Sequence, residues 1–456
     1  MPTDTASKAH AMEPDCSCDL MVVGAGMAGM AAALFASSRG LSVAQAGALG
    51  GIDFSTGMLD LLGMHPVEEL HAVDNPWQGL EALRRDEPHH PYGLVPDADV
   101  RAAFEDFTAF LAEAGLPYDG YADRNARVLT SLGTVKPTYR APCSMWPGVQ
   151  AMERKLPCLI IDFIGLKGFS GRQIVEVRGP EWPGLRSVRI PFPGCAGELY
   201  PEHLAWSLTE MDVVDWLAES VAEHVQDAQA VGFPAVLGPY AAPASTASST
   251  ASVGAASSGL YDVIARLRER LGVEIFEIPT MPPSIAGLRL RAAFETFLPG
   301  RGVRIYPQKR VAEWERTDNG GFRFHIAGAG EGDIEAVVEA RGAILAGGRF
   351  FGKGLTADRH AVHEPLFGLP VLQPKHRDEW HREDFFDARG HPLNRTGVEV
   401  DARLRPLSEN GHPAFPNLFA AGSILANQDW MRAKCGAGLA IATAYAAVQS
   451  YQNSLS

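Results

Sequence analysis

The segment G-A-G-M-A-G begins at Gly24 and has the G-x-G-x-x-G spacing of a phosphate-binding turn. In such a turn the first glycine, Gly24, makes the tight bend, and the second, Gly26, lets a phosphate approach the backbone. The third, Gly29, lets the following helix pack closely on the preceding strand. Free N–H groups and the dipole at the start of that helix attract an anion. The motif therefore favours a nucleotide site over close helix–strand packing alone.

The residues around this turn have the pattern of a strand, a helix and a second strand. Residues 20–23 read as a buried parallel strand, residues 27–39 as a helix of small and apolar side chains, and residues 41–44 as the next strand. Gly40 suits the position just after the helix. This βαβ unit is the setting in which the glycine motif becomes specific for a nucleotide.

The stretch after the second predicted strand lacks an expected partner of the motif. A dinucleotide site has an Asp or Glu about twenty residues on, which accepts hydrogen bonds from the adenosine ribose. Residues 41–51 contain no acid, and Gln45 is the polar candidate there. A mononucleotide flavin has no adenosine ribose, so this gap favours FMN over FAD and NAD. FAD is the alternative, because backbone groups or water can replace the carboxylate.

Further glycine-containing segments have the residue types to contact a flavin. Residues 50–57 form a glycine and hydroxyl loop that can bring small donors against a flat ring, although an ordinary connecting loop has the same composition. The turns at 346–348 and 421–423 resemble the later glycine turns of flavoproteins, with a serine where an Asp is usual. A last helix begins near residues 435–438, and its dipole can stabilise negative charge on a reduced flavin. The predicted cofactor-binding residues are Gly24, Gly26, Gly29, Ser55, Thr56, Gly57, Gly347, Gly348, Gly422, Ser423, Gly436 and Ala437.

Length and composition indicate a globular protein of two to three domains. The chain has 456 residues, of which 46% are hydrophobic and 21% are charged, close to the globular average. Its net charge of -14 would repel a phosphate backbone, so a general nucleic-acid footprint is excluded. An anionic ligand must then be held by a local basic cluster.

The six cysteines do not have the spacing of a metal site. Cys16 and Cys18 lie in a polar segment with only each other as nearby ligands, and the remaining cysteines are scattered, so we expect no zinc or iron–sulfur site. Such unpaired thiols fit a reducing cytosol. Cys435 has two interpretations, a redox-active thiol or a small packing residue. We also expect no membrane-spanning segment, since glycines interrupt the uncharged stretch 20–38.

The order of these segments predicts a discontinuous flavin-binding domain. We expect a disordered tail at 1–18, a flavin-binding domain built from 19–150 and 336–456, and a second, inserted α/β domain at 151–335. Within the second domain, residues 241–258 are almost entirely Ala, Ser, Thr and Gly, a composition typical of a flexible insertion.

Three motifs resemble one known family. Residues 54–62 (FSTGMLDLL), residues 279–290 (PTMPPSIAGLRL) and residues 348–368 (GRFFGKGLTADRHAVHEPLFG) are similar to the B subunits of anaerobic glycerol-3-phosphate dehydrogenase. The resemblance runs from about Leu20 to Gln449. It implies a Rossmann-like FAD/NAD(P)-binding flavoprotein fold and a subunit usually assigned FMN.

The resemblance also implies an activity and partners. The complex would oxidise sn-glycerol 3-phosphate to dihydroxyacetone phosphate and pass the electrons to the quinone pool. This subunit would pair with an FAD-containing catalytic subunit and a membrane-associated iron–sulfur subunit, and would lie in the cytoplasm at the inner face of the membrane. Two other functions stay open: a non-catalytic electron-transfer and scaffold subunit of the same complex, and another flavin oxidoreductase of the fumarate reductase type.

Basic residues inside the family-like motifs are candidates for the substrate. Arg289 and Arg359 have the planar fork that suits a phosphate, and Arg349 and Lys353 follow a predicted glycine turn. The alternative for each is an ion pair with a nearby acid. His360 and His363 are candidate bases for a hydroxyl proton, although a solvated loop histidine has the same appearance. The predicted catalytic residues are Arg289, Arg359 and His363.

Overall fold

The computed structural model describes residues 13–47, 50–194, 197–241, 259–328, 330 and 332–455. The chain forms two compact units, the first made of residues 1–51, 60–107 and 295–456 and the second of residues 52–59 and 108–294. Most of the predicted tail, residues 1–12, and the predicted flexible insertion, residues 242–258, lie outside the described residues. The first unit is thus discontinuous in sequence.

The first unit is built around a seven-stranded sheet with the order β11-β2-β1-β14-β13-β12, and β19 also pairs with β14. Strands β11, β2, β1, β14 and β19 are parallel to their neighbours in this group, whereas β13 runs antiparallel to β14 and to β12. The buried runs in β1 and β14 are apolar, as strands covered on both faces require. The strand bounds are β1 Cys16–Val23, β2 Val43–Gly47, β11 Val303–Pro307, β12 Lys309–Arg316, β13 Phe322–Gly328, β14 Ile334–Leu345 and β19 Leu418–Ala420.

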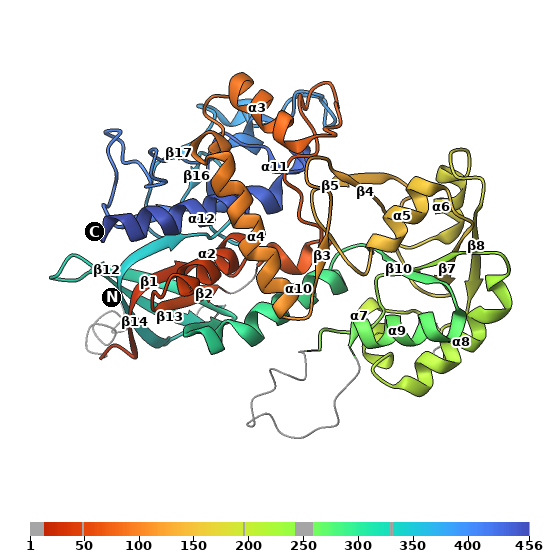
Figure 1. Cartoon of the computed structure of the whole chain (residues 1–456). Coiled ribbons are helices and arrows are strands. Elements are labelled where there is room, and N and C mark those ends of the chain that lie inside the picture. The colour runs from red at the N-terminus through yellow and green to blue at the C-terminus, as the bar shows by residue number, and fades with distance from the viewer. Residues whose placement is uncertain are drawn as a thin grey trace. The chain divides into compact units, whose positions relative to one another are not determined.

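Two helices rich in small residues pack together in this unit: α2 (Met27–Ser38) and α12 (Gly436–Ser454) lie side by side (Figure 1). Phe35 and Tyr445 meet edge to face between them, with ring centroids 5.2 Å apart. Alanine and glycine leave little side-chain bulk, so the helices approach closely and both are buried over most of their length. Helix α2 ends as predicted, with Gly40 donating its N–H to the Ser37 carbonyl.

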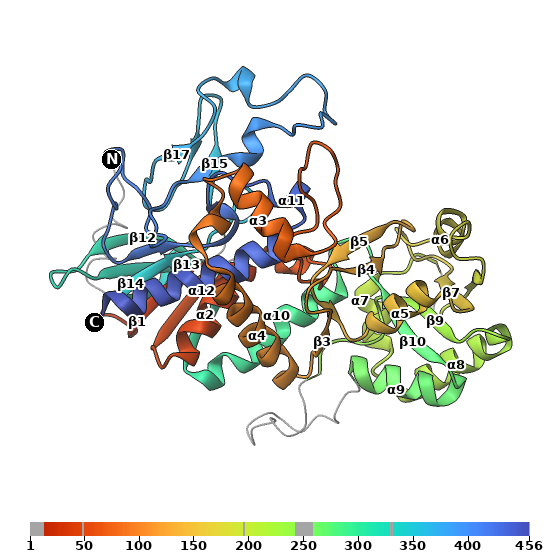
Figure 2. The same cartoon turned by 45° about the horizontal axis from the view of Figure 1, so that its top comes forward.

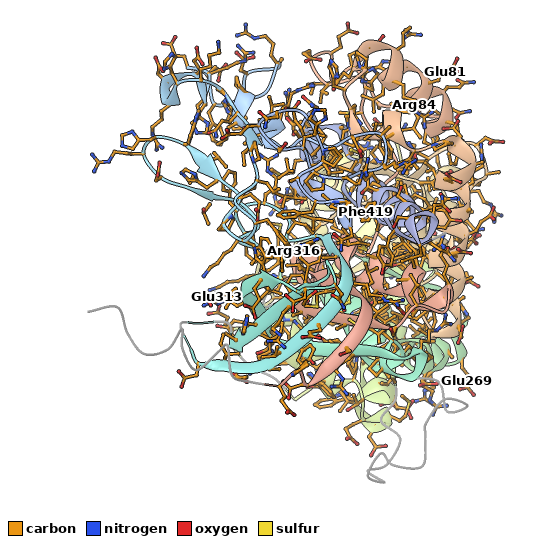
Figure 3. The ribbon with its side chains drawn as sticks, turned by 90° about the vertical axis from the view of Figure 1, so that its left-hand side faces the viewer. Glu81, Arg84, Glu269, Glu313, Arg316 and Phe419 are labelled. Carbon is orange, nitrogen blue, oxygen red and sulfur yellow. The ribbon has the colours of Figure 1, made fainter. Side chains whose placement is uncertain are left out.

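Shorter elements complete the first unit. Helix α3 (Pro76–Asp86) is capped by the preceding residue Asn75, whose side chain accepts hydrogen bonds from the N–H groups of Trp77 and Gln78. Arg84 of α3 donates to the carbonyls of Tyr92 and Val95 at 3.0 Å each (Figure 3). The other bounds are α4 Asp97–Glu113, which continues into the second unit, β15 Thr356–Ala357, β16 Val362–His363, β17 Val371–Leu372, β18 Gly397–Val398 and α11 Trp430–Ala433.

The aromatic side chains show how this sheet is filled. Phe419 of β19 is buried, and its ring lies 6.1 Å from that of Tyr451 on α12 (Figure 3). Arg316 of β12 lies over the Phe322 ring at 4.7 Å, whereas Glu313 lies on the same strand at one edge of the sheet (Figure 3).

The second unit contains a four-stranded parallel sheet with the order β10-β9-β7-β8. Helices α5 and α6 cover one face of this sheet, and α8 and α9 cover the other (Figure 1). The chain therefore winds in both directions from β7, as in doubly wound α/β sheets. The bounds are α5 Trp146–Arg154, β7 Cys158–Phe163, α6 Gly171–Arg178, β8 Leu185–Ile190, α7 Pro201–Ser207, α8 Met211–Val225, β9 Ala230–Pro234, α9 Leu260–Leu271, β10 Glu274–Ile278 and α10 Ile285–Phe297, with short strands β3 Tyr118–Asp119, β4 Ala126–Leu129, β5 Val135–Thr138 and β6 Ala141–Pro142.

The structure differs from the sequence prediction at several boundaries; residues 52–59, for example, belong to the second unit rather than to the first. Strand β1 begins at Cys16, inside the predicted tail, because Cys16 pairs with Val338 of β14. Residues 303–328 supply three strands to the first sheet and so lie in the first unit rather than the second domain. Residues 108–150 belong to the second unit, where Gly148 of α5 lies against the ring of Phe276.

Candidate functional site

The first and third glycines of the motif are required by protein packing. Gly24 follows β1 with a φ of +133°, a conformation that side chains rarely adopt. A Cβ on Gly24 would lie under 3.0 Å from the carbonyl of Ala346, and a Cβ on Gly29 under 3.0 Å from the carbonyl of Gly24. The backbone of the turn therefore lies against the end of β14, and α2 packs closely on the turn.

The second glycine is different. Gly26 has an ordinary φ of -82°. Among the described residues other than its chain neighbours, the nearest atom to a Cβ on Gly26 would be the Gly51 nitrogen, at 3.8 Å. No described side chain caps the start of α2, and the first turn of this helix contains no acid. Neither strain nor crowding explains this glycine, whereas an anion on the open N–H groups of the helix does. The residues present therefore fit a bound phosphate.

Gln45 supports the turn from inside the protein. It is only 1% exposed, and its Nε2 donates to the Gly24 carbonyl at 3.0 Å. Its Oε1 is buried and has no hydrogen-bond partner among the described residues. Gln45 is thus committed to the backbone of the turn and does not replace the missing ribose-binding acid.

Gly47, at the end of β2, and Gly50, the first residue of the predicted 50–57 loop, lie close to this turn. A Cβ on Gly47 or on Gly50 would lie under 3.0 Å from the backbone of Ala25. A larger residue would therefore not fit at either position. The sequence signal was the recurrence of glycine at 47, 50 and 51.

The later glycine turns converge on the same edge of the first sheet. Gly348 follows β14, and a Cβ there would lie 3.7 Å from the Ser423 hydroxyl oxygen. Gly422 follows β19 with a φ of +81°, and a Cβ there would lie 2.6 Å from that of Ala28 on α2. Because β1, β14 and β19 are parallel, their carboxyl ends meet at one edge, where ligands bind in open α/β sheets. Gly347 lies here too, beside Gly24.

Thr443 holds this edge together and was missed by reasoning from the sequence. It is fully buried on α12, and its Oγ1 accepts the N–H of Gly422 at 2.8 Å while donating to the Leu439 carbonyl at 2.5 Å. A threonine inside an alanine-rich helix was the available signal.

The start of α12 is packed closely. Gly436 lies against the Trp430 ring, 2.7 Å from where a Cβ would be, and Gly438 donates its N–H to the Asp60 carbonyl at 2.7 Å. Ala437 is half-buried, and no side chain caps the helix. Cys435 is fully buried, and burial raises the pKa of its thiol, which disfavours the thiolate needed for redox chemistry. The packing interpretation of Cys435 is therefore favoured.

The predicted loop of Ser55, Thr56 and Gly57 belongs to the second unit. Tyr118 donates to the Gly57 carbonyl at 2.6 Å, and the Ser284 hydroxyl donates to the Ser55 carbonyl. These bonds fix the loop backbone, whereas the side chains of Ser55 and Thr56 are half-buried.

Arg289 is committed to protein groups. It is 3% exposed, with Nη1 2.7 Å and Nη2 2.9 Å from the two carboxylate oxygens of Glu277. Its Nε and Nη2 also donate to the Gly238 carbonyl. The prediction that Arg289 binds substrate phosphate is replaced by the ion-pair alternative, because these bonds use most of its donors inside the second unit.

The other two predicted catalytic residues lie on an exposed hairpin of the first unit, formed by β15 and β16. Arg359 is exposed and makes no ion pair within the described ranges. His363 Nε2 lies 3.2 Å from Asp358 Oδ2. Hydrogen bonds from the Ala361 and His360 backbone hold the pKa of Asp358 at about 2. His360 itself is exposed.

Arg349, next to the Gly347–Gly348 turn, has a structural role. It donates to the carbonyls of Leu393, at 2.6 Å, and Asn394. Burial lowers the pKa of its guanidinium. Lys353 is exposed.

Over the described part of the chain, no group of three or more His, Cys, Asp or Glu residues is placed to hold a metal ion. None of the helices described there is both long and apolar enough to cross a lipid bilayer.

Comparison with known proteins decides the family. The family model described as an FAD binding domain matches residues 19–157 and 203–439. The B subunit of anaerobic glycerol-3-phosphate dehydrogenase from Vibrio vulnificus strain YJ016 is 30% identical over 448 residues, covering 94% of this chain and 95% of the relative. The chain belongs to the family of anaerobic glycerol-3-phosphate dehydrogenase B subunits. A probable B subunit from Halobacterium salinarum strain R1 is 32% identical, covering 94% of this chain and 96% of the relative.

Membership of the B subunit family confirms the resemblance and the predicted flavoprotein fold, and it indicates a flavin-dependent oxidoreductase. A flavocytochrome c3 fumarate reductase in its open conformation is 11% identical, with a TM-score of 0.42, covering 99% of this chain and 80% of that protein.

Proposed function

We propose that this chain is a flavoprotein subunit of an anaerobic glycerol-3-phosphate dehydrogenase, which oxidises sn-glycerol 3-phosphate to dihydroxyacetone phosphate and passes the electrons to quinone. Gly26 carries the proposal, because its space beside the uncapped start of α2 suits a cofactor phosphate and no contact with another described residue requires a glycine there. By the resemblance, the partners are an FAD-containing subunit and a membrane-associated iron–sulfur subunit. They would hold the chain at the inner face of the membrane.

The cofactor we propose is FMN, with FAD as the alternative. The family model is named for FAD, but residues 41–51 of this chain contain no acid, and the side chain of Gln45 donates its hydrogen bond to the Gly24 carbonyl. Release of the flavin by heat from the purified chain, followed by chromatography, tests the identity. Recovery of FAD alone would overturn the FMN proposal.

The residues proposed to hold the flavin lie in several segments of the chain. Gly24 to Gly29 would hold the phosphate, and the turns that end β14 and β19, with the start of α12, would face the rest of the cofactor. Ser55, Thr56 and Gly57 lie in the second unit, and their contact with the cofactor stays a prediction from the sequence. A bound flavin accepts a hydride from an alcohol carbon.

For the substrate, we propose that Arg359 binds the phosphate and His363 takes the hydroxyl proton. The Asp358 carboxylate, 3.2 Å from His363 Nε2, favours the tautomer with hydrogen on Nε2 and leaves Nδ1 as the proton acceptor. The same contact with Asp358 also orients the His363 ring. Because Arg359 is exposed, its guanidinium group can contact an anion from solvent.

A second candidate function is electron transfer without substrate oxidation on this chain. The commitment of Arg289 to Glu277 favours it, because one of the two predicted phosphate ligands is then occupied. Glycerol 3-phosphate added anaerobically to the isolated flavin-loaded chain separates the two functions. Bleaching of the flavin absorbance supports oxidation here, and an unchanged spectrum that bleaches only in the whole complex supports the relay.

A further inference from the structure

A loop of the first unit, residues 376–392 between β17 and β18, is closed by its own hydrogen bonds and extends from the rest of that unit (Figure 2). His391 links its two sides, with Nδ1 accepting the Arg382 N–H at 3.1 Å and Nε2 lying 3.1 Å from the Phe385 carbonyl. One neutral tautomer satisfies both bonds. Trp380 is 4% exposed and anchors the base of the loop.

The tip of this loop presents two adjacent aromatic rings to solvent. Phe385 is 77% exposed and Phe386 is 85% exposed, the highest values for large apolar side chains in the described part of the chain. Their rings meet edge to face with centroids 4.9 Å apart. Asp384 accepts the Phe386 N–H at 2.9 Å, so the backbone of the tip is ordered before any partner binds. An ordered tip loses less conformational freedom on binding than a mobile one.

The loop is joined to the segment that leads into α12. Arg432 of α11 donates to the Ala388 carbonyl, and Asp429 accepts the Asn394 side-chain N–H at 2.9 Å. Only two residues separate α11 from α12. Met431, also on α11, is 60% exposed.

The charges beside the tip are mainly negative. A hollow of about 720 Å³ is lined by Glu379, His381, Arg382, Glu383, Asp384, Asp387, Arg389 and Pro392. Asp387 pairs with Arg389 at 2.6 Å and with Arg382 at 3.9 Å. Glu383 makes no ion pair with any described residue and remains exposed next to the Phe pair. Such acids repel anionic lipid, whereas they attract a protein surface that carries Lys and Arg.

We propose that the loop of residues 376–392 docks onto the partner subunit that exchanges electrons with this chain in the complex. Phe385 and Phe386 enter an apolar depression of that subunit, and its rim carries basic residues that face Glu383 and Asp384. Contact here places the partner beside α11 and the start of α12, the end of the unit that we propose faces the flavin. The inference rests on the proposed function.

The test is assembly of the full chain with its FAD-containing and iron–sulfur subunits. The double variant F385S/F386S should weaken association by about 30-fold or more, the usual loss for a central aromatic anchor. Flavin content and Tm should stay at the wild-type values, since neither ring is buried. W206S removes another exposed aromatic, 62% exposed and in the second unit, and should assemble normally. E383K should weaken association and reduce its dependence on salt.

Four outcomes would overturn the docking proposal. The first is unchanged assembly of F385S/F386S, and the second is equal loss in W206S. The third is self-association of the isolated chain that the double variant abolishes, which would identify a second copy as the occupant. The fourth is wild-type binding to phosphatidylglycerol vesicles that the double variant loses, which would identify lipid. Failure of the proposed function is separate: a wild-type complex that assembles through Phe385 and Phe386 but lacks flavin or glycerol 3-phosphate oxidation leaves the docking surface intact.

Discussion

The amide nitrogen of Gln45 donates a 3.0 Å hydrogen bond to the carbonyl of Gly24, so a buried side chain of β2 holds the turn that follows β1. Without this donor the Gly24 carbonyl would face an apolar interior. The bond explains why a polar residue occupies the middle of a buried parallel strand. It also means that the shape of the glycine turn depends on a residue outside the glycine motif.

Replacing Gln45 by leucine should therefore weaken both the fold and the flavin site. Leucine has a similar volume but cannot donate, and a buried unsatisfied carbonyl costs about 1–3 kcal/mol. We expect a fall of that size in the free energy of unfolding, measured by urea denaturation, together with faster release of flavin followed by its fluorescence. A variant with unchanged stability would show that the Gly24 carbonyl finds another donor.

The glycines of the motif should respond differently to alanine. Gly29→Ala should fail to fold or lose several degrees in Tm, because its Cβ would meet the Gly24 backbone. Gly26→Ala should keep a near-wild-type Tm but lose flavin. Among the described residues beyond its chain neighbours, the nearest atom to the added methyl group lies 3.8 Å away, so the methyl group would instead occupy the space of the phosphate. Tm and bound flavin per folded chain, measured on both variants, check the contrast. Full flavin content in Gly26→Ala would show that the cofactor phosphate does not bind at this turn.

Substitution of Arg289 should lower stability, whereas substitution of Arg359 should lower the affinity for the substrate. Arg289→Ala leaves the carboxylate of Glu277 buried without its cation, a change that typically costs about 3–5 kcal/mol of folding free energy. Arg359→Ala should leave Tm unchanged and raise the dissociation constant for glycerol 3-phosphate by about 10- to 150-fold, from the strength of a charge-assisted bond. Calorimetric titration of the two variant complexes, beside thermal melts, measures both quantities. Equal affinity in Arg359→Ala and wild type would exclude Arg359 as the phosphate ligand.

His90 should make the fold sensitive to mild acid. The side chain is 2% exposed and stacks on Tyr92, and burial lowers its pKa to about 3, with the nearby cations Arg395 and Arg84 and the neighbouring His65 acting in the same direction. The unfolded chain binds a proton near pH 6.5, whereas the folded chain does not, so stability is highest above pH 6.5 and is lost as pH falls towards 3.

Between pH 6.5 and pH 5 this histidine should contribute a loss of about 2 kcal/mol. His90→Asn keeps an acceptor for the Tyr92 N–H but cannot titrate, and should lose correspondingly less stability over the same interval. Urea unfolding at both pH values measures the difference, and parallel curves for wild type and His90→Asn would contradict the assignment.

The start of the fold and the class of ligand could be read from the sequence because their signals are local. The glycine spacing at 24–29 and the apolar runs on either side lie within about thirty residues, and the structure places β1, α2 and β2 there. The end of β14 before the turn at 347 and the short strand β19 before the turn at 422 were also recognisable, because each combines an apolar run with glycine. Three sequence motifs then identified the family.

What required the tertiary structure was the partner of each side chain. Arg289 has the same residue type and motif position whether it binds phosphate or Glu277, and only the folding of α10 against β10 and Gly238 decides between them. Thr443 meets Gly422 across twenty-one residues, and the strands β11 to β13 join the first sheet from a stretch that looked like part of the second domain. Hydrogen bonds and ion pairs depend on distances of a few ångström in space, which neither residue type nor sequence spacing specifies once the chain has folded back on itself.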